Sequence, residues 1–313
     1  MIELAIPDQA LVTSLKALAA RRYSFTTITP ASHQRVLGRL PARIAETVEE
    51  VFGWSLPFGE RLLSAELLEP LRASGGLEDV SGAFRAKLRV SSVDGRLYVH
   101  SSFPTLAADA VFLGPDSYRF ARLIAAELSR QPLVKAARVV DIGTGAGVGA
   151  LTVGGLAPDA KLVGTDVNAD ALRLASVNAT AAGMDLQVIE TSALDGIDGP
   201  FDLILLNPPF IADDGDRVYR DGGRRHGGQL SLDLAKVALA KLAPGGRLIM
   251  YTGSAIIKGQ DRLYTALAGL VEDGRQLQYN ELDPDIFGEE LSKPAYSDVD
   301  RIALVSAIFR CPV

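Results

Sequence analysis

Cysteine, histidine and long apolar runs are all scarce in this chain of 313 residues. The single cysteine, Cys311, excludes an internal disulfide framework and a zinc site built on cysteine pairs. The three histidines, His33, His100 and His226, lack metal-ligand spacing, so we expect no metal site. No apolar run approaches the roughly 20 residues that span a bilayer, and the first residues do not resemble a signal peptide. We therefore expect a cytoplasmic protein without membrane contact.

Excess positive charge is also lacking. The 32 Lys and Arg residues are outnumbered by 38 Asp and Glu, which gives a net charge of −6 and a pI near 5.2. The chain thus has no global basic footprint for nucleic acid, although net charge leaves a local patch open. With 48% hydrophobic and 22% charged residues, the composition is that of a globular protein, and the length is enough for two domains.

Residues 1–105 are predicted to form a smaller N-terminal α+β domain. Helical periodicity, caps and prolines indicate four helices, at about residues 8–19, 30–40, 41–51 and 60–72. In the first of these we expect Asp8 to cap the helix. Its apolar face would be formed by four residues: Leu11, Leu15, Leu18 and Ala19. Thr29 and Pro30 provide the cap and the first turn of the second helix.

The apolar period then changes from helical to two. Phe84 to Val90 alternates apolar with basic residues, and Asp94-Gly95 predicts a hairpin turn before a second strand. Helices followed by a hairpin resemble a winged helix, in which Arg85, Lys87 and Arg89 could contact nucleic acid. We favour the alternative that these charges are the solvated face of a strand. A substrate-recognition or dimerisation domain fits equally well.

Residues 106–313 are predicted to form the second domain, after a junction near 105–114. Strands and helices alternate there, which predicts an α/β fold with a doubly wound, mostly parallel sheet. The strands are expected at 137–142, 161–165, 186–190, 201–206 and 247–251, with two more near 277–281 and 301–309. The sheet would thus have seven strands, one of them antiparallel. The acidic segment Asp283–Asp300 is too long to be a simple loop. It either folds over the site, which we favour, or forms a surface excursion.

A glycine-rich turn follows the first of these strands, in the order Asp141-Ile142-Gly143-Thr144-Gly145. Glycines permit close approach of the backbone to a ligand, and a second acid, Asp166, ends the next strand where it can accept ribose hydroxyls. These features indicate a nucleotide-like ligand. A dinucleotide is an alternative, because the spacing from Gly145 to Ala150 also satisfies a dinucleotide fingerprint. Asn168 and Asn178, further on, are interpreted as capping or surface residues.

The fourth strand stops at Asn207, which is followed by Pro208, Pro209 and Phe210. Prolines cannot continue the ladder, so a carboxamide is held at the strand end, where parallel sheets bind ligands. Asn207 and the Pro208 carbonyl could accept the two N–H groups of a planar nitrogen, and Phe210 could pack on its flat face. The structural alternative is a rigid turn.

Asn-Pro-Pro-Phe and Asp141-x-Gly-x-Gly together resemble the motifs of class I methyltransferases, and residues 112–313 resemble their HemK-type branch, the release-factor glutamine methyltransferases. The resemblance implies a Rossmann-like fold, S-adenosylmethionine as methyl donor and S-adenosylhomocysteine as product. The implied donor contacts are Asp141, Gly143, Thr144, Gly145, Asp166, Val167, Ser192, Ala193 and Asn207. The implied catalytic residues are Asn207, Pro208, Pro209 and Phe210, and the candidate substrate contacts are Asp116, Tyr118 and Tyr219.

Two departures from the family pattern weaken the inference about substrate, and a third, at Ser192, weakens the inference that a side chain binds the adenine amino group of the donor. Phe210 stands where release-factor enzymes more commonly have a tyrosine. Phenylalanine at this position also occurs in guanine methyltransferases of ribosomal RNA. Ser192 stands where many relatives carry an acid, and the N-terminal region does not resemble their helical bundle. We therefore expect N-methylation of an amide or amine in a protein, glutamine-like, or in a small molecule. Methylation of an exocyclic amine in RNA is the alternative, and a non-catalytic donor-binding module is the third.

Overall fold

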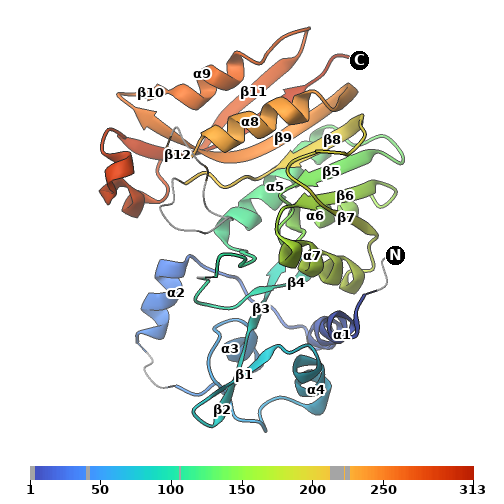
Figure 1. Ribbon diagram of the computed structural model, residues 1–313, viewed down its shortest axis with the longest axis vertical. Helices are drawn as coiled ribbons and strands as arrows, with labels where there is room; N and C mark the ends of the chain where they lie inside the picture. Colours follow the sequence, from blue (N-terminus) through green and yellow to red (C-terminus); the bar gives the residue numbers. More distant parts are fainter. Residues whose placement is uncertain (1–3, 40–42, 106, 212–221, 223–225) are drawn as a thin grey trace.

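The computed structural model describes residues 4–39, 43–105, 107–211, 222 and 226–313. In Figure 1 the C-terminal part, with the large sheet, lies above the N-terminal part, and the hairpin of β3 (Leu88–Val93) and β4 (Arg96–Ser101) reaches up between them. Among the described helices, none is long and apolar enough to cross a membrane.

The large sheet has the strand order β11-β12-β9-β8-β5-β6-β7. Its strands are β5 (Arg138–Ile142), β6 (Lys161–Asp166), β7 (Leu186–Glu190), β8 (Phe201–Leu206), β9 (Leu242–Ile257), β11 (Gln276–Asp283) and β12 (Arg301–Arg310). The five from β5 to β9 are parallel, whereas β12 runs antiparallel to both of its neighbours. This confirms the predicted seven strands with one antiparallel member, and a two-residue strand, β10 (Gln260–Asp261), is added beside β9.

Helices cover both faces of this sheet: α5 (Pro115–Arg130), α6 (Val148–Leu156), α7 (Ala169–Ala181), α8 (Gln229–Leu239) and α9 (Arg262–Ala268). Successive residues of a strand point to opposite faces, so the apolar run of β8 supplies two cores. Leu203 and Leu205 belong to the core with α5, α6 and α7, whereas Ile204 and Leu206 belong to the core with α8 and α9. This confirms the sequence prediction that β8 is an apolar strand buried on both faces.

The N-terminal part contains α1 (Ile6–Ala20), α2 (Pro30–Leu37), α3 (Val48–Phe52), α4 (Ala65–Ala73) and two hairpins. The four predicted helices are confirmed, and Thr29 caps α2 by accepting the N–H of Ser32. Asp94-Gly95 forms the predicted turn between β3 and β4. However, the alternating run breaks at Lys87, so β2 (Ala83–Ala86) pairs with β1 (Leu77–Val80) rather than continuing into β3.

Three helix starts differ from the prediction, and one of them is that of α4, which begins at Ala65 and not near residue 60. The helix α1 begins at Ile6 with Ala5 as its cap, and Asp8 instead binds Arg173 at 2.7 Å, so the capping role of Asp8 was wrong. Ala19, expected on the apolar face of this helix, is exposed. The helix α3 begins only at Val48, because Thr47 and Glu50 form a capping box there.

The solvated-face interpretation of the strand charges holds for Lys87 but is wrong for Arg89. Arg89 is 2% exposed, and its Nε donates to the carbonyl oxygen of Ser101 at 3.2 Å. It lies directly opposite His100 in the hairpin, and His100 is fully buried. Burial lowers the pKa of Arg89 to about 10. The register of β3 turns this basic residue into the interior, so it cannot serve as an exposed nucleic-acid contact.

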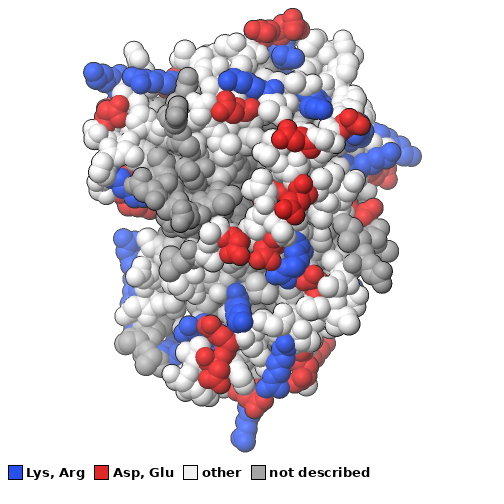
Figure 2. Space-filling view, in the orientation of Figure 1, with Lys and Arg blue, Asp and Glu red and all other residues white. Residues whose placement is uncertain are grey.

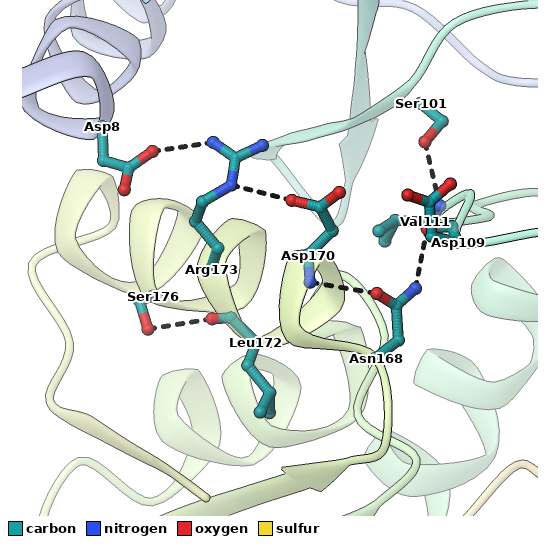
Figure 3. A network of polar contacts seen from close by, with 9 residues as sticks. All are labelled: Asp8, Ser101, Asp109, Val111, Asn168, Asp170, Leu172, Arg173 and Ser176. Atoms are coloured by element: carbon teal, nitrogen blue, oxygen red, sulfur yellow. Dashed lines mark hydrogen bonds and ion pairs between the residues drawn. The ribbon is translucent and has the colours of Figure 1, made fainter. Parts of the chain in front are cut away.

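Figure 3 shows how the two parts of the chain are joined. Arg173 of α7 binds Asp8 of α1 at 2.7 Å and Asp170 at 3.1 Å. Asn168 caps α7 through the N–H of Asp170 and donates to the Asp109 carbonyl oxygen at 2.7 Å, so its predicted capping role is confirmed. The boundary near residue 105 stays a prediction, since one apolar cluster includes residues of both parts.

Asn178 is neither a cap nor a surface residue. It is fully buried on α7, and its Nδ2 donates to the carbonyl oxygens of Val99 and Ala146, at 3.1 and 2.9 Å. Its Oδ1 accepts the N–H of Val99 at 2.8 Å. The side chain thus joins β4 to the turn that follows β5.

Candidate active site

A cavity of about 360 Å³ lies at the carboxyl ends of β5, β6, β7 and β8. This is the end of a parallel sheet at which ligands bind. The cavity is lined by all of the predicted donor contacts: Asp141, Gly143, Thr144, Gly145, Asp166, Val167, Ser192, Ala193 and Asn207. Pro208, Pro209, Phe210 and Asp116 line the same space. The fold therefore gathers residues that are up to 94 positions apart in the sequence.

Of the predicted substrate contacts, one described residue is not in this cavity. Tyr118 lies outside its lining, and the Tyr118 hydroxyl oxygen accepts the N–H of Thr27 at 2.9 Å. Tyr219 lies outside the described residues.

The glycines of the turn are open to the cavity. Gly143 and Gly145 have φ values of +66° and +54°, which strain any other residue. A Cβ at either position would meet no atom within 4 Å, so the space beside this backbone is free. A ligand can therefore approach the turn as closely as the sequence predicted.

Asp141 organises the turn from behind. Its Oδ2 accepts the Thr144 hydroxyl and the N–H of Ala150, both at 2.9 Å. A Cβ at Gly149 would lie 2.7 Å from the same oxygen, so Gly149 gives the carboxyl its space. Burial raises the pKa of Asp141 to about 7. These contacts agree with the loop-organising role implied by the resemblance.

Asp166 ends β6 at the wall of the cavity. Its two oxygens each accept one backbone N–H at 3.0 Å, from Gly145 and from Asn168. Each carboxylate oxygen has a second acceptor position, so the group can also accept two neighbouring hydroxyls of a ribose. Burial raises the pKa of Asp166 as well. The carboxyl thus fixes the glycine turn and faces the ligand space at once.

Asn207 follows β8 directly and stands partly exposed in the cavity. Within the described part of the chain, its carboxamide forms no hydrogen bond, whereas other asparagines near the site, such as Asn168 and Asn178, are fully engaged. A polar group held on a rigid strand end without an internal partner is available to a ligand.

Phe210 is held tightly from behind. A Cβ at Gly253 of β9 would lie 2.4 Å from Cδ2 of the Phe210 ring, and one at Gly227 would lie 2.2 Å from the Phe210 carbonyl oxygen. The N–H of Gly222 donates to the Ile211 carbonyl oxygen at 2.8 Å. Backbone without side chains therefore encloses the motif and fixes the ring orientation.

The acidic segment that follows β11 reaches the cavity, as expected. Phe287 lines it, and its ring centroid is 5.8 Å from that of Phe210. Two short 3₁₀ turns, Gly288–Ser292 and Pro294–Tyr296, give the segment internal structure. Sequence reasoning did not identify Phe287, because an isolated aromatic residue in an acidic loop carries no local signal.

Asp116 opens α5 at the edge of the cavity. Its Oδ1 accepts the Tyr251 hydroxyl at 2.8 Å and lies 3.6 Å from the guanidinium of Arg119. Burial raises the pKa of Asp116, and these two partners oppose the shift. Arg119 in turn lies 3.7 Å from Asp283. This carboxyl already has partners within the protein, and its role as a substrate contact stays a prediction.

The strand order, the glycine turn with its acid and the Asn-Pro-Pro-Phe turn in one cavity define the architecture of a class I methyltransferase. Residues 111–263 match the family described as "Methyltransferase small domain". The release factor glutamine methyltransferase of Deinococcus radiodurans is 37% identical over 157 residues, which is 47% of this chain and 55% of that protein. The enzyme of the same name from Bradyrhizobium diazoefficiens is 35% identical over 162 residues, which is 47% of this chain and 54% of that protein.

Another relative is named as an RNA methyltransferase. The ribosomal RNA small subunit methyltransferase C of Serratia proteamaculans is 42% identical over 73 residues, which is 23% of this chain and 21% of that protein. The chain spans about half the length of the release-factor relatives it matches. Over the matched residues it is similar to HemK-type class I S-adenosylmethionine-dependent methyltransferases, which supports the resemblance found in the sequence.

Proposed function

We propose that this protein transfers a methyl group from S-adenosylmethionine to a planar amide nitrogen, of a glutamine side chain in a protein. The observation that carries the proposal is the carboxamide of Asn207, which has no hydrogen-bond partner among the described residues and shares one cavity with Phe210 and Asp166. The named relatives that share the domain, the release factor glutamine methyltransferases, support the choice of acceptor.

The residues of the cavity fit the donor. The open backbone beside Gly143 and Gly145 suits the close approach of a methionine moiety, and Asp166 suits a ribose. Val167 is 53% exposed and offers an apolar surface beside that acid for a flat base. The cavity volume lies within the range of small-molecule sites, which is roughly 300–1,000 Å³. When bound, the donor supplies an activated methyl group.

The protein's own contribution is positioning and electrostatics. An amide nitrogen is a poor nucleophile because its lone pair is delocalised into the carbonyl. Oδ1 of Asn207 would accept one N–H of the target and the Pro208 carbonyl the other, which turns the lone pair out of the amide plane. Phe210 would pack on the flat face of the group. Both acceptors are held on a rigid turn, so they need no reorganisation during transfer. The nitrogen would gain the methyl group as the sulfur–methyl bond of the donor breaks, and it would then be cationic. It would therefore release one proton readily along one of these hydrogen bonds to solvent, so no strong base is required.

RNA is the second candidate, because one relative is named as a ribosomal RNA methyltransferase. The described charges argue against it. On the face shown in Figure 2, basic and acidic side chains are interspersed among the described residues, and Arg89 of the presumed wing is buried. A phosphate backbone requires several exposed Lys or Arg contacts, which make binding strongly salt-dependent.

The test is transfer of a tritiated methyl group from the donor to three purified acceptors. The first is a bacterial release factor, the second is the same factor with the glutamines of its labelled peptide replaced, and the third is ribosomal RNA. Label in the first acceptor at glutamine, and in neither of the others, supports the proposal. Label in RNA would establish the second candidate. Donor binding without transfer to any fraction of a cell lysate would indicate a non-catalytic donor-binding module.

A further inference from the structure

The segment between β11 and β12 carries one aromatic residue into the cavity, and its backbone is unusual. Phe287 has a φ of +53°, in the left-handed region, where a residue with a side chain is strained by roughly 1–2 kcal/mol. Such strain persists where the surrounding structure imposes it, often at ligand sites.

Contacts on both sides hold Phe287 in this conformation. Before it, the N–H of Ile286 donates to the Ile302 carbonyl oxygen of β12 at 2.9 Å, and Ile286 is buried. After it, the N–H of Glu290 donates to the Phe287 carbonyl oxygen at 2.8 Å. The Glu290 carboxylate, itself 2% exposed as a residue, binds Lys293 at 2.6 Å. The ring is therefore directed by a built segment and not by a loose loop.

Phe287 is not needed to support Phe210. The Phe210 ring is already packed against Gly253, and only 7% of Phe210 is exposed. The two rings are 5.8 Å apart at an interplanar angle of 56°. Phe287 keeps more exposed surface than Phe210, and both line the cavity that Asn207 enters. The rings form an open apolar corner beside the Asn207 carboxamide, to which no described residue is hydrogen-bonded.

Building on the function proposed above, we propose that Phe287 is the second aromatic wall of the acceptor site and selects flat, uncharged acceptor groups. A planar amide that donates to Asn207 enters the corner between the rings and contacts both with its faces and edges, which suits their quadrupoles. A bulky tetrahedral group fills this corner poorly. The segment 283–300 thus contributes specificity from outside the motif that carries the chemistry.

The experiment compares four variants in the full chain saturated with S-adenosylhomocysteine. Phe287→Ala removes the wall, Phe287→Leu keeps apolar bulk without flatness, and Phe287→Tyr keeps the flat face. Glu289→Gln changes an exposed side chain two positions away and serves as the matched control. The probes are N-acetylglutaminamide, a minimal glutamine side chain, and guanosine, a minimal exocyclic amine. Saturation-transfer NMR measures probe binding, and calorimetry measures binding of the demethylated donor.

We expect Phe287→Ala to weaken probe binding about tenfold, with Phe287→Leu intermediate and Phe287→Tyr within about threefold of the parent. Binding of the demethylated donor should stay unchanged in all four. With an acceptor that the protein methylates, Phe287→Ala should raise KM and leave kcat unchanged. Equal probe binding by the parent and Phe287→Ala overturns the inference, and so does a parent that binds neither probe.

Failure of the proposed function has a different signature. If the parent binds N-acetylglutaminamide in a Phe287-dependent way but methylates no glutamine, the aromatic wall stands and the acceptor assignment falls. If glutamine is methylated with the same KM by the parent and by Phe287→Ala, the acceptor assignment stands and the wall falls.

Discussion

The carboxamide of Asn178 makes both backbone hydrogen bonds of Val99: it accepts the Val99 N–H at 2.8 Å and donates to the Val99 carbonyl oxygen at 3.1 Å. A side chain of α7 thus completes β4 as a neighbouring strand would. The same Nδ2 donates to Ala146 in the glycine turn, so one buried residue couples the N-terminal hairpin to the donor side of the cavity. The two parts of the chain are therefore attached at the turn that the ligand approaches.

Asn178→Leu should lower the free energy of unfolding by several kcal/mol. The buried N–H and carbonyl groups of Val99 would lose their partners, and each unsatisfied group costs roughly 1–3 kcal/mol. Denaturant unfolding followed by circular dichroism measures the change. Asn168→Ala, which removes a more exposed cap, is the comparison and should cost about 1 kcal/mol. Equal losses in the two variants would contradict the role assigned to Asn178.

Asn207→Ala should lower turnover by a factor on the order of 10² to 10³, the usual cost of one preorganised hydrogen-bonding group. Donor binding should remain near the parent value, because the glycine turn and Asp166 are untouched. Single-turnover rates with tritiated donor, together with calorimetry, separate the two effects. Asn207→Asp should be milder if the target becomes cationic during transfer. A parental rate in Asn207→Ala would reduce the motif to a rigid turn.

Asp166→Ala should weaken donor binding strongly, for two reasons. The ribose loses its acceptor, and the N–H groups of Gly145 and Asn168 lose theirs. Asp166→Asn retains one oxygen and should bind with intermediate affinity. Calorimetric titration with S-adenosylhomocysteine measures both variants, and unchanged affinity in Asp166→Ala would place the ribose elsewhere.

Gly253→Ala should impair acceptor use without affecting donor binding. The added methyl group would lie 2.4 Å from Cδ2 of the Phe210 ring, so the ring must shift. We expect KM for the acceptor to rise, with the donor Kd unchanged. Gly59→Ala, where no atom lies within 4 Å of the added methyl group and φ is not positive, is the control for effects on folding. A Gly253→Ala protein with parental KM would show that the orientation of Phe210 is unimportant.

Protein stability should fall in weakly acidic solution because of His33. This residue is fully buried, its Nε2 lies 3.1 Å from the Trp54 carbonyl oxygen, and its ring stacks on Phe103 with centroids 4.2 Å apart. Burial, with a smaller effect of Arg89, lowers the pKa of His33 to about 4. In the unfolded chain the histidine pKa is about 6.5, so the unfolded state binds a proton on this side chain more readily than the folded state. Acid therefore favours unfolding.

The loss of stability should begin as the pH falls below about 6.5 and be complete near pH 4, with a size on the order of 3 kcal/mol. Unfolding free energies measured at steps of pH give the slope. His33→Phe should flatten it. His100 is also fully buried with a lowered pKa, caused first by burial and then by Arg89, so part of the slope should persist in that variant. A slope that is identical in His33→Phe would contradict this assignment.

Local sequence patterns were sufficient for the catalytic part. Strands that are apolar on both faces and alternate with amphipathic helices admit few architectures, so the sheet from β5 to β12 followed from periodicity. The turn at Gly143–Gly145, the acid Asp166 and the turn after Asn207 are each fixed by a few neighbouring residues. Because parallel strands end at one edge, the sequence also determined that these groups meet in one site.

The N-terminal part shows where local patterns fail. The alternation from Phe84 to Val90 has the period of one strand, yet the chain changes partner at Lys87, whose N–H donates to Gly76. Whether Arg89 is solvated depends on what covers that face of the hairpin. The groups near Arg89 come from distant segments, such as Tyr118 of α5 and Tyr23, and no pattern within β3 indicates them.

The sequence by itself determined the fold class, the donor side of the cavity and the position of Asn207, because each rests on short-range backbone chemistry. Only the tertiary structure decided that Phe287 stands beside Phe210, that Asn178 completes β4 and that Arg89 is buried. In these three contacts the partners are separated in the sequence by 77, 79 and 12 positions, respectively. Side-chain packing between distant elements leaves no periodic trace in the chain, so the place of Phe287 beside the Asn-Pro-Pro-Phe turn was visible only in the folded structure.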